Sequence, residues 1–119
     1  MVEDQVKEPL ARAYAHIARR EFPEAEAAAR REIQLAPYSA QAQVVLAEAL
    51  IGQGRSEAAR AAAERAIALG PDRPTGHVAL ASAWLAADRP DQAEPAARRA
   101  VALDHVRRTP TGFSGAPSS

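Results

Sequence analysis

The chain repeats itself every 34 residues, and this period constrains its fold more than any other feature of the sequence. Pro37 and Pro71 stand 34 residues apart, and each closes a similar apolar segment, REIQLAP or RAIALGP. The same offset relates five further series, which are Ala13, Ala47 and Ala81; Ala15, Ala49 and Ala83; Ala25, Ala59 and Ala93; Ile33, Ile67 and Val101; and Leu35, Leu69 and Leu103. Such a period predicts a repeat array, in which each unit buries its apolar faces against its neighbours.

Start and stop signals split each period into two helices. In the middle unit Ser39 is a suitable N-cap for a helix that ends near Ile51, and the glycines of segment 52–54 provide a left-handed turn. We expect Ser56 to cap a second helix, which the Gly-Pro pair at 70–71 ends. Frequent alanine and sparse β-branched residues favour close helix packing over strands. The sequence therefore predicts an all-α fold of three antiparallel helix-turn-helix units.

The third unit marks its helices with different residues. Pro74 suits a first helical turn, and segment 88–90 (Asp-Arg-Pro) replaces the glycine turn. Pro95 fits the second helix poorly. With Asp91 as N-cap, Pro95 loses one early hydrogen bond, whereas an earlier helix start costs about 3 kcal/mol, as for an interior proline. We favour the start at Asp91 and an end near Leu103.

The middle unit carries the pattern of a known family. In LAEALIGQGRSEAARAAAERAIALGP, residues 46–71, a large-small pair opens the segment, Gly54 lies in the turn, Ala59 and Ala66 lie in the second helix, and proline follows. This segment resembles the tetratricopeptide repeat. The third unit keeps Leu80, Ala81, Trp84, Ala93 and Ala100 of the same pattern, with His105 at the proline position. The first unit keeps Ala13, Phe22, Ala25 and Pro37, but it has Arg12, Arg20 and Glu32 at family positions for a large apolar residue, a glycine and an alanine.

The resemblance implies that the three units stack into a short right-handed superhelical array over residues 8–104. The units are expected at about 8–37, 38–71 and 72–104. Residues 1–7 and 105–119 are expected to form a flexible leader and a flexible tail, since the tail is rich in Pro, Gly, Ser and Thr.

A further row of side chains runs along the first helix of every unit at i, i+4 and i+7. These nine residues are Leu10, Tyr14 and Ile17; Val44, Glu48 and Ile51; and Val78, Ser82 and Leu85. Such a stripe is more often core than binding site. However, Leu46 and Leu50, or Leu80 and Trp84, already account for packing of the first helices. Proteins similar to this one line a concave groove with these positions, so the resemblance implies a peptide-binding groove.

The groove lacks the side chains that grip a terminal carboxylate. Relatives that bind chaperone C-termini use Lys, Asn and Arg for this contact. The corresponding positions here are Leu10, Tyr14, Glu48, Thr75 and Ala79, and Glu48 would repel a carboxylate. Chaperone tails are therefore disfavoured as ligands.

We find no pattern that predicts a metal, a cofactor or a catalytic residue. His16 aligns with a core position, His77 with a family tryptophan and His105 with the repeat-ending proline, and none has the i, i+4 spacing of a helical metal pair. The arginine pairs alternate with acidic residues, and most lie near helix C-termini, as solvated or capping cations do. Neither a phosphate-binding glycine loop nor a plausible Ser-His-Asp set occurs. We expect a protein that is not an enzyme.

The composition limits the classes of partner and the cellular compartment that we expect. Lys+Arg and Asp+Glu balance at 15 each, so no net field attracts nucleic acid or an anionic membrane. The chain has no cysteine, and we find no apolar run long enough for a signal peptide or a membrane span. We expect a cytoplasmic protein, and the frequent alanine and arginine indicate a GC-rich, bacterial genome.

Two functions fit this sequence. The leading one is a protein-protein interaction module, an adaptor or scaffold whose groove binds a peptide or helix of a partner protein. The alternative is a self-assembly element, in which the same stripe and the uncapped third unit pair with another copy. Charging Leu85 or Val78 distinguishes them, because it would disperse an oligomer and leave the mass of a monomer unchanged.

Overall fold

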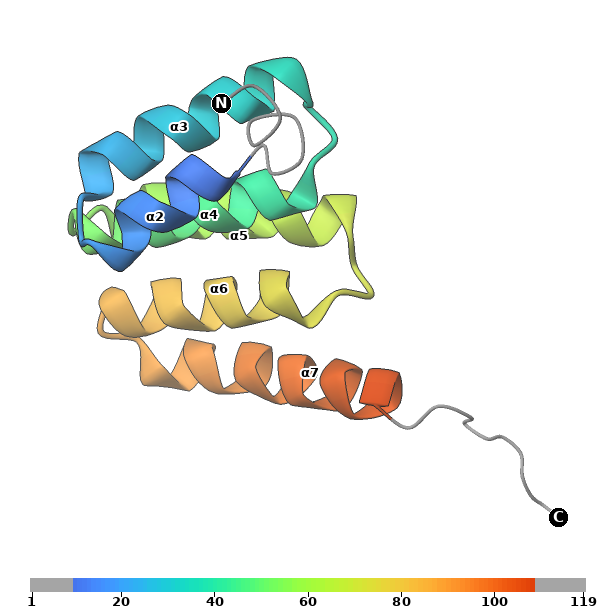
Figure 1. Cartoon of the computed structure of the whole chain (residues 1–119). Coiled ribbons are helices and arrows are strands. Elements are labelled where there is room, and N and C mark those ends of the chain that lie inside the picture. Colours follow the sequence, from blue (N-terminus) through green and yellow to red (C-terminus); the bar gives the residue numbers. More distant parts are fainter. Residues whose placement is uncertain (1–9, 109–119) are drawn as a thin grey trace, which may run out of the picture.

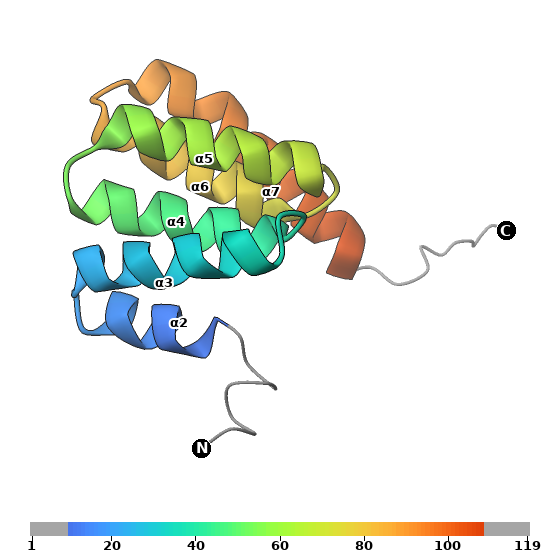
Figure 2. The ribbon, with the colours of Figure 1, turned by 90° about the horizontal axis from the view of Figure 1, so that it is seen from above.

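The structure, a computed structural model, describes residues 10–108. Within this span it consists of helices without strands: α2 (Ala11–Ala18), α3 (Phe22–Leu35), α4 (Ala40–Gly52), α5 (Ser56–Leu69), α6 (Pro74–Ala86) and α7 (Pro90–Arg108). Each helix packs against the next one along the chain, and α4 also contacts both α2 and α6. Figures 1 and 2 show the resulting stack, which ends with α7. The predicted all-α array of antiparallel helix pairs is confirmed.

The 34-residue period is present in the helix bounds. Helices α3 and α5 begin and end 34 residues apart, and so do α4 and α6. The three turns inside the units repeat at the same interval, because Arg20, Gly54 and Asp88 all have positive φ, at 63°, 76° and 62°. We therefore call α2, α4 and α6 the first helices of their units, and α3, α5 and α7 the second helices.

The turn inside each unit is held by one pattern of backbone hydrogen bonds. In the middle unit the N–H of Gly54 donates to the carbonyl of Ile51, and the N–H of Arg55 donates to that of Leu50. This is the Schellman arrangement, which requires a left-handed residue. The same two bonds recur around Arg20 and around Asp88, so the fold places a non-glycine residue in a left-handed conformation at two of three turns.

Of the expected helix starts, those at Ser39 and Pro74 are confirmed and the one at Ser56 is wrong. The Ser39 side chain accepts the N–H of Ala42 at 3.1 Å, and Pro74 opens α6. Ser56 does not cap α5, because Arg55 holds the N-cap position and Ser56 is already the first helical residue. A serine one residue inside the helix has its side chain out of line with the free N–H groups of the first turn.

Helix α7 differs from its predicted bounds at both ends. It begins at Pro90 rather than after Asp91, so Pro95 lies inside the helix. Pro90 takes the first helical position, where its missing N–H and fixed φ are favourable, and this preference outweighs the cost of Pro95. The helix also continues past Leu103 to Arg108, so the predicted boundary after residue 104 falls within it. Residues 1–7 and 109–119 lie outside the described residues.

Small side chains make up most of the core. Most alanines that recur at the period are buried, including Ala25, Ala59 and Ala93, and they allow the helices of each unit to approach closely. The largest fully buried side chains are Leu50 and Val45, both on α4. The third unit has a separate small cluster of buried alanines on α6 and α7, against which Leu80 and Trp84 pack. The core is therefore deepest around the middle unit.

No described helix combines the length and the apolar character needed to cross a bilayer.

Candidate protein-binding face

The nine predicted groove residues lie on the three first helices, which are neighbours in the stack. We call the surface that they form the first-helix face. Helix α4 contacts α2 on one side and α6 on the other, so residues 34 apart form rows across this face. The rows differ in exposure from one unit to the next.

The polar row in the middle of the face consists of Tyr14, Glu48 and Ser82. The Gln41 side-chain amide donates a hydrogen bond to the Tyr14 hydroxyl, which joins α2 to α4. Glu48 is exposed overall, yet partial burial of its carboxylate raises the pKa of this group. Ser82 is half-buried on α6. The row thus offers a hydroxyl, a partly desolvated carboxylate and another hydroxyl.

The apolar residues of the face divide into a packed group and an exposed group. Val44 is only 4% exposed, and Leu10, Ile17 and Ile51 pack partly buried against the same core cluster. The equivalent residues on α6 remain open, since Val78 is 52% exposed and Leu85 is 59% exposed. Helix α4 is flanked by two first helices and α6 by one, which explains the difference. The apolar surface available for contact therefore lies mainly on α6.

The histidines have ordinary structural surroundings. His16 is half-buried, and its Nδ1 donates to the Glu21 carboxylate at 2.7 Å. The Nε2 atom of His77 lies 3.3 Å from the Pro71 carbonyl. In the part of the chain that the structure describes, no group of three or more His, Cys, Asp or Glu side chains is arranged to hold a metal ion.

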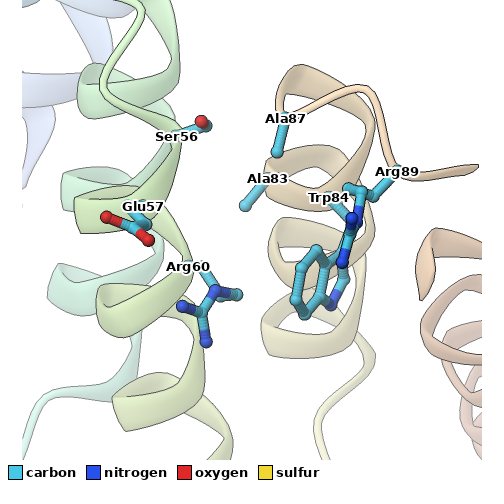
Figure 3. Close-up of a pocket in the computed structure, with 7 residues that line it drawn as sticks. All are labelled: Ser56, Glu57, Arg60, Ala83, Trp84, Ala87 and Arg89. Atoms are coloured by element: carbon cyan, nitrogen blue, oxygen red, sulfur yellow. The ribbon is translucent and has the colours of Figure 1, made fainter.

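A pocket of about 330 Å³ lies elsewhere, between α5 and α6 (Figure 3). Ser56, Glu57 and Arg60 line it from α5. Ala83 and Trp84 line it from the end of α6, with Ala87 and Arg89 in the following turn. The Arg60 guanidinium carbon lies 5.0 Å from the centre of the Trp84 ring, within the range of a cation-π contact.

This pocket was not predicted. Trp84 was predicted to be a packing residue, and none of the residues that line the pocket was among the nine predicted groove residues. The signal that marks the pocket is the pattern of replacements at the 34-residue period, because Ser56 and Arg60 stand where the first unit has Phe22 and Glu26. Positions of this kind differ in size and in charge, whereas the packing alanines do not.

Comparison with known proteins agrees with this architecture. The sequence matches the tetratricopeptide repeat family twice, over residues 10–74 and 44–111. The chain therefore belongs to the tetratricopeptide repeat family. No curated protein matches the sequence.

A solved structure titled MamA MSR-1 C2 has a similar fold, with a TM-score of 0.71 and 18% sequence identity. The match covers 88% of this chain and 64% of that one, so the chain spans less than two thirds of the length of its neighbour. At this identity the likeness concerns the fold. Tetratricopeptide repeats are in general protein-protein interaction and scaffold modules, and they are typically non-catalytic.

Proposed function

We propose that the first-helix face binds a peptide or helix of a partner protein, and that the protein acts as a non-catalytic adaptor. The observation that carries this proposal is the pair of exposed apolar residues on α6, Val78 at 52% and Leu85 at 59%. They lie 7 residues apart, two turns along one side of the helix. Covering the open half of each side chain would contribute roughly 1 kcal/mol to binding.

The charge of the face selects the partner. The Glu48 carboxylate, whose pKa is raised by burial, is costly to desolvate further without a donor. A partner with two aliphatic or aromatic anchors and a Lys, Arg or neutral donor opposite Glu48 satisfies both requirements. An acidic C-terminus would place like charges together. The setting that we propose is a cytoplasmic complex of a bacterium, in keeping with the composition.

The exposed face of α7 supports a second candidate function, which is self-assembly. Ile67 on α5 is half-buried, and Gly76 of the next unit lies against it. Val101 occupies the equivalent position on α7 and is 68% exposed. A second copy that packs on α7 would cover Val101 as α6 covers Ile67.

A selection from a random-peptide library displayed on phage tests the first function. The selected peptides are expected to carry two apolar anchors and to bind Leu85→Glu at least about tenfold more weakly, because the new carboxylate would be buried at the contact. Leu35→Glu on α3, where Leu35 is 78% exposed, is the matched control and should bind normally. Peptides that bind both variants equally, or a selection that yields none, would contradict the proposal.

A further inference from the structure

The pocket between α5 and α6 has a counterpart in the same chain, at the contact of the first two units. We call the contact of α3 with α4 the first junction and the contact of α5 with α6 the second junction. Subtracting 34 from the pocket residues gives the equivalent positions at the first junction. The helices of the two junctions have equivalent bounds, so their side chains can be compared position by position.

The first junction is filled by two groups of α3. One is the ring of Phe22, which lies directly against Gly52, because a methyl group on Gly52 would overlap the ring. The other is the carboxylate of Glu26, which accepts hydrogen bonds from the Gln53 amide at 2.9 Å and from Arg55 at 3.0 Å. These contacts lower the pKa of Glu26, the Gln53 hydrogen bond most of all. An aromatic ring and an anion therefore complete this junction.

The second junction lacks both groups. Ser56 replaces Phe22 and Ala86 replaces Gly52, so no ring closes this junction, and a pocket lies beside Ser56. Arg60 replaces Glu26, while Arg89 keeps the position and the charge of Arg55.

Arg89 lacks the carboxylate partner that Arg55, its equivalent, has at the first junction. The carboxylate that pairs with Arg60 is Glu64 at 3.4 Å, a contact along α5 itself. Among residues 10–108 no carboxylate pairs with Arg89. Figure 3 shows the Glu57 carboxylate directed away from Trp84. The pocket lining thus joins an indole wall to two guanidinium groups and one carboxylate, and its excess of positive charge attracts an anion that also has apolar surface.

We propose that the second junction binds a segment of a partner protein that supplies an aromatic or large apolar side chain followed, one helical turn later, by a carboxylate. The carboxylate would pair with Arg60 and Arg89, and the apolar side chain would rest against Ala83, Trp84 and Ala87. The i, i+4 spacing is the one that Phe22 and Glu26 use on α3 at the first junction. This pocket is a docking point separate from the first-helix face.

Segment 109–119, which lies outside the described residues, does not provide this combination. Phe113 is the aromatic residue nearest the C-terminus, and segment 109–119 contains no Asp or Glu. The pocket lies at the start of α7, and the 19 residues of that helix span about 28 Å. The five residues from 109 to 113 reach at most about 18 Å, so Phe113 cannot return to the pocket of its own chain. The basic and aromatic lining of the pocket is the ground for a separate protein as the occupant.

The probe for this proposal is a blocked synthetic peptide with the sequence of residues 20–36, REFPEAEAAARREIQLA, which carries the ring and the carboxylate at the required spacing. Trp84 is the single tryptophan of the chain, so its fluorescence reports binding at the pocket. We expect a saturable change at millimolar peptide. The Glu26→Gln peptide should bind about tenfold more weakly, as expected for loss of a charge-assisted hydrogen bond, and the Glu32→Gln peptide should bind normally.

Protein variants locate the binding. Arg89→Gln should weaken it about tenfold, whereas Arg99→Gln on the exposed side of α7 and Val78→Glu on the first-helix face should leave it unchanged. The triple variant Ser56→Phe, Ala86→Gly, Arg60→Glu introduces the ring, the glycine and the carboxylate of the first junction, and it should abolish binding while keeping its helical circular dichroism. A non-saturable response, equal binding of all the peptides, or indifference to Arg89→Gln would overturn the proposal. If no peptide bound the first-helix face, peptide binding at the second junction would be unaffected, so the two proposals can fail separately.

Discussion

The two junctions of the array have equivalent helix bounds and opposite side-chain chemistry. At the first junction the Phe22 ring lies against Gly52, and the Glu26 carboxylate accepts hydrogen bonds across the contact. Leu50, which lies behind them, is 1% exposed. At the second junction Ser56, Ala86 and Arg60 leave a pocket, and Trp84, the equivalent of Leu50, is half-buried. A repeat array thus tolerates replacement at a few equivalent positions without a change in its helices, and such positions can be used for binding instead of cohesion.

A different cause opens the first-helix face of the third unit. Val78 and Leu85 are exposed because no further first helix packs beside α6 in the described chain, whereas Val44 and Ile51 are covered from both sides. Openness at the end of the array follows from position. The pocket inside the array, at the second junction, results instead from the side chains that replace those of the first junction.

The largest expected difference between the middle unit and the third unit is in core packing. Leu46 and Leu80 occupy equivalent positions, but Leu46 is 3% exposed and Leu80 is half-buried. We expect Leu46→Ala to lower the free energy of unfolding by about 3 kcal/mol and Leu80→Ala by about half as much, because less apolar contact is lost. Urea unfolding followed by circular dichroism measures both. Equal losses would mean that the third unit is packed as tightly as the middle one.

The contact of Phe22 with Gly52 gives the next largest effect. Gly52→Ala is expected to lower the free energy of unfolding by about 2 kcal/mol, because its methyl group overlaps the ring. In the Phe22→Ala background the same change should raise it by about 0.5 kcal/mol through helix propensity. A double-mutant cycle in urea isolates this coupling. Additive effects would show that the ring does not rest on the glycine.

The Glu26 bridge makes the first junction sensitive to acid. Because the Gln53 hydrogen bond and the arginines lower the pKa of Glu26 in the folded state, its contribution is complete above the unfolded pKa and is lost as the pH falls through the folded one. Glu26→Gln should therefore cost about 1 kcal/mol at neutral pH and nothing in strong acid. Unfolding free energies across the pH range measure this.

The control for Glu26 is Glu94→Gln, which removes an exposed i, i+4 pair with Arg98 on α7. Its cost should stay below about 0.5 kcal/mol, as for most surface pairs. If both variants lost the same free energy of unfolding at every pH, the hydrogen bonds of Glu26 across the first junction would contribute no more than an exposed surface pair.

The smallest effects concern the turns, which are the part that all units share. Gly54→Ala should lower the free energy of unfolding by about 1 kcal/mol, because φ is 76° there. Asp88→Gly should raise it by about 0.5 kcal/mol, since aspartate tolerates the left-handed region better than most residues do. Thermal unfolding detects both shifts. A loss of stability in Asp88→Gly would mean that its side chain supports the turn.

The sequence predicted the fold well, since its period and its turn residues are properties of single positions. Ser39, Pro74 and the turn at Gly54 were each recognisable from residue type. The bounds of α7 were not, because Pro90 and Pro95 compete for the helix start and their balance depends on tertiary packing.

The candidate sites were harder to predict. The nine groove residues follow the period, but exposure depends on which neighbours cover each row, so Val44 is buried while Val78 is open. The pocket at the second junction arises from three replacements that act together, and no single residue among them indicates a site. Comparing each unit with the next, position by position, would have revealed these replacements and hence the pocket.

The measurement that tests the central claim most directly is the solution mass by light scattering, over a concentration series, for wild type and for Leu85→Glu. The claim is that the exposed apolar side of α6 binds a different protein and not a second copy of the chain. It predicts a concentration-independent monomer for both proteins. A dimer or larger species that Leu85→Glu disperses would contradict it, and would show that copies of the chain use this face for assembly.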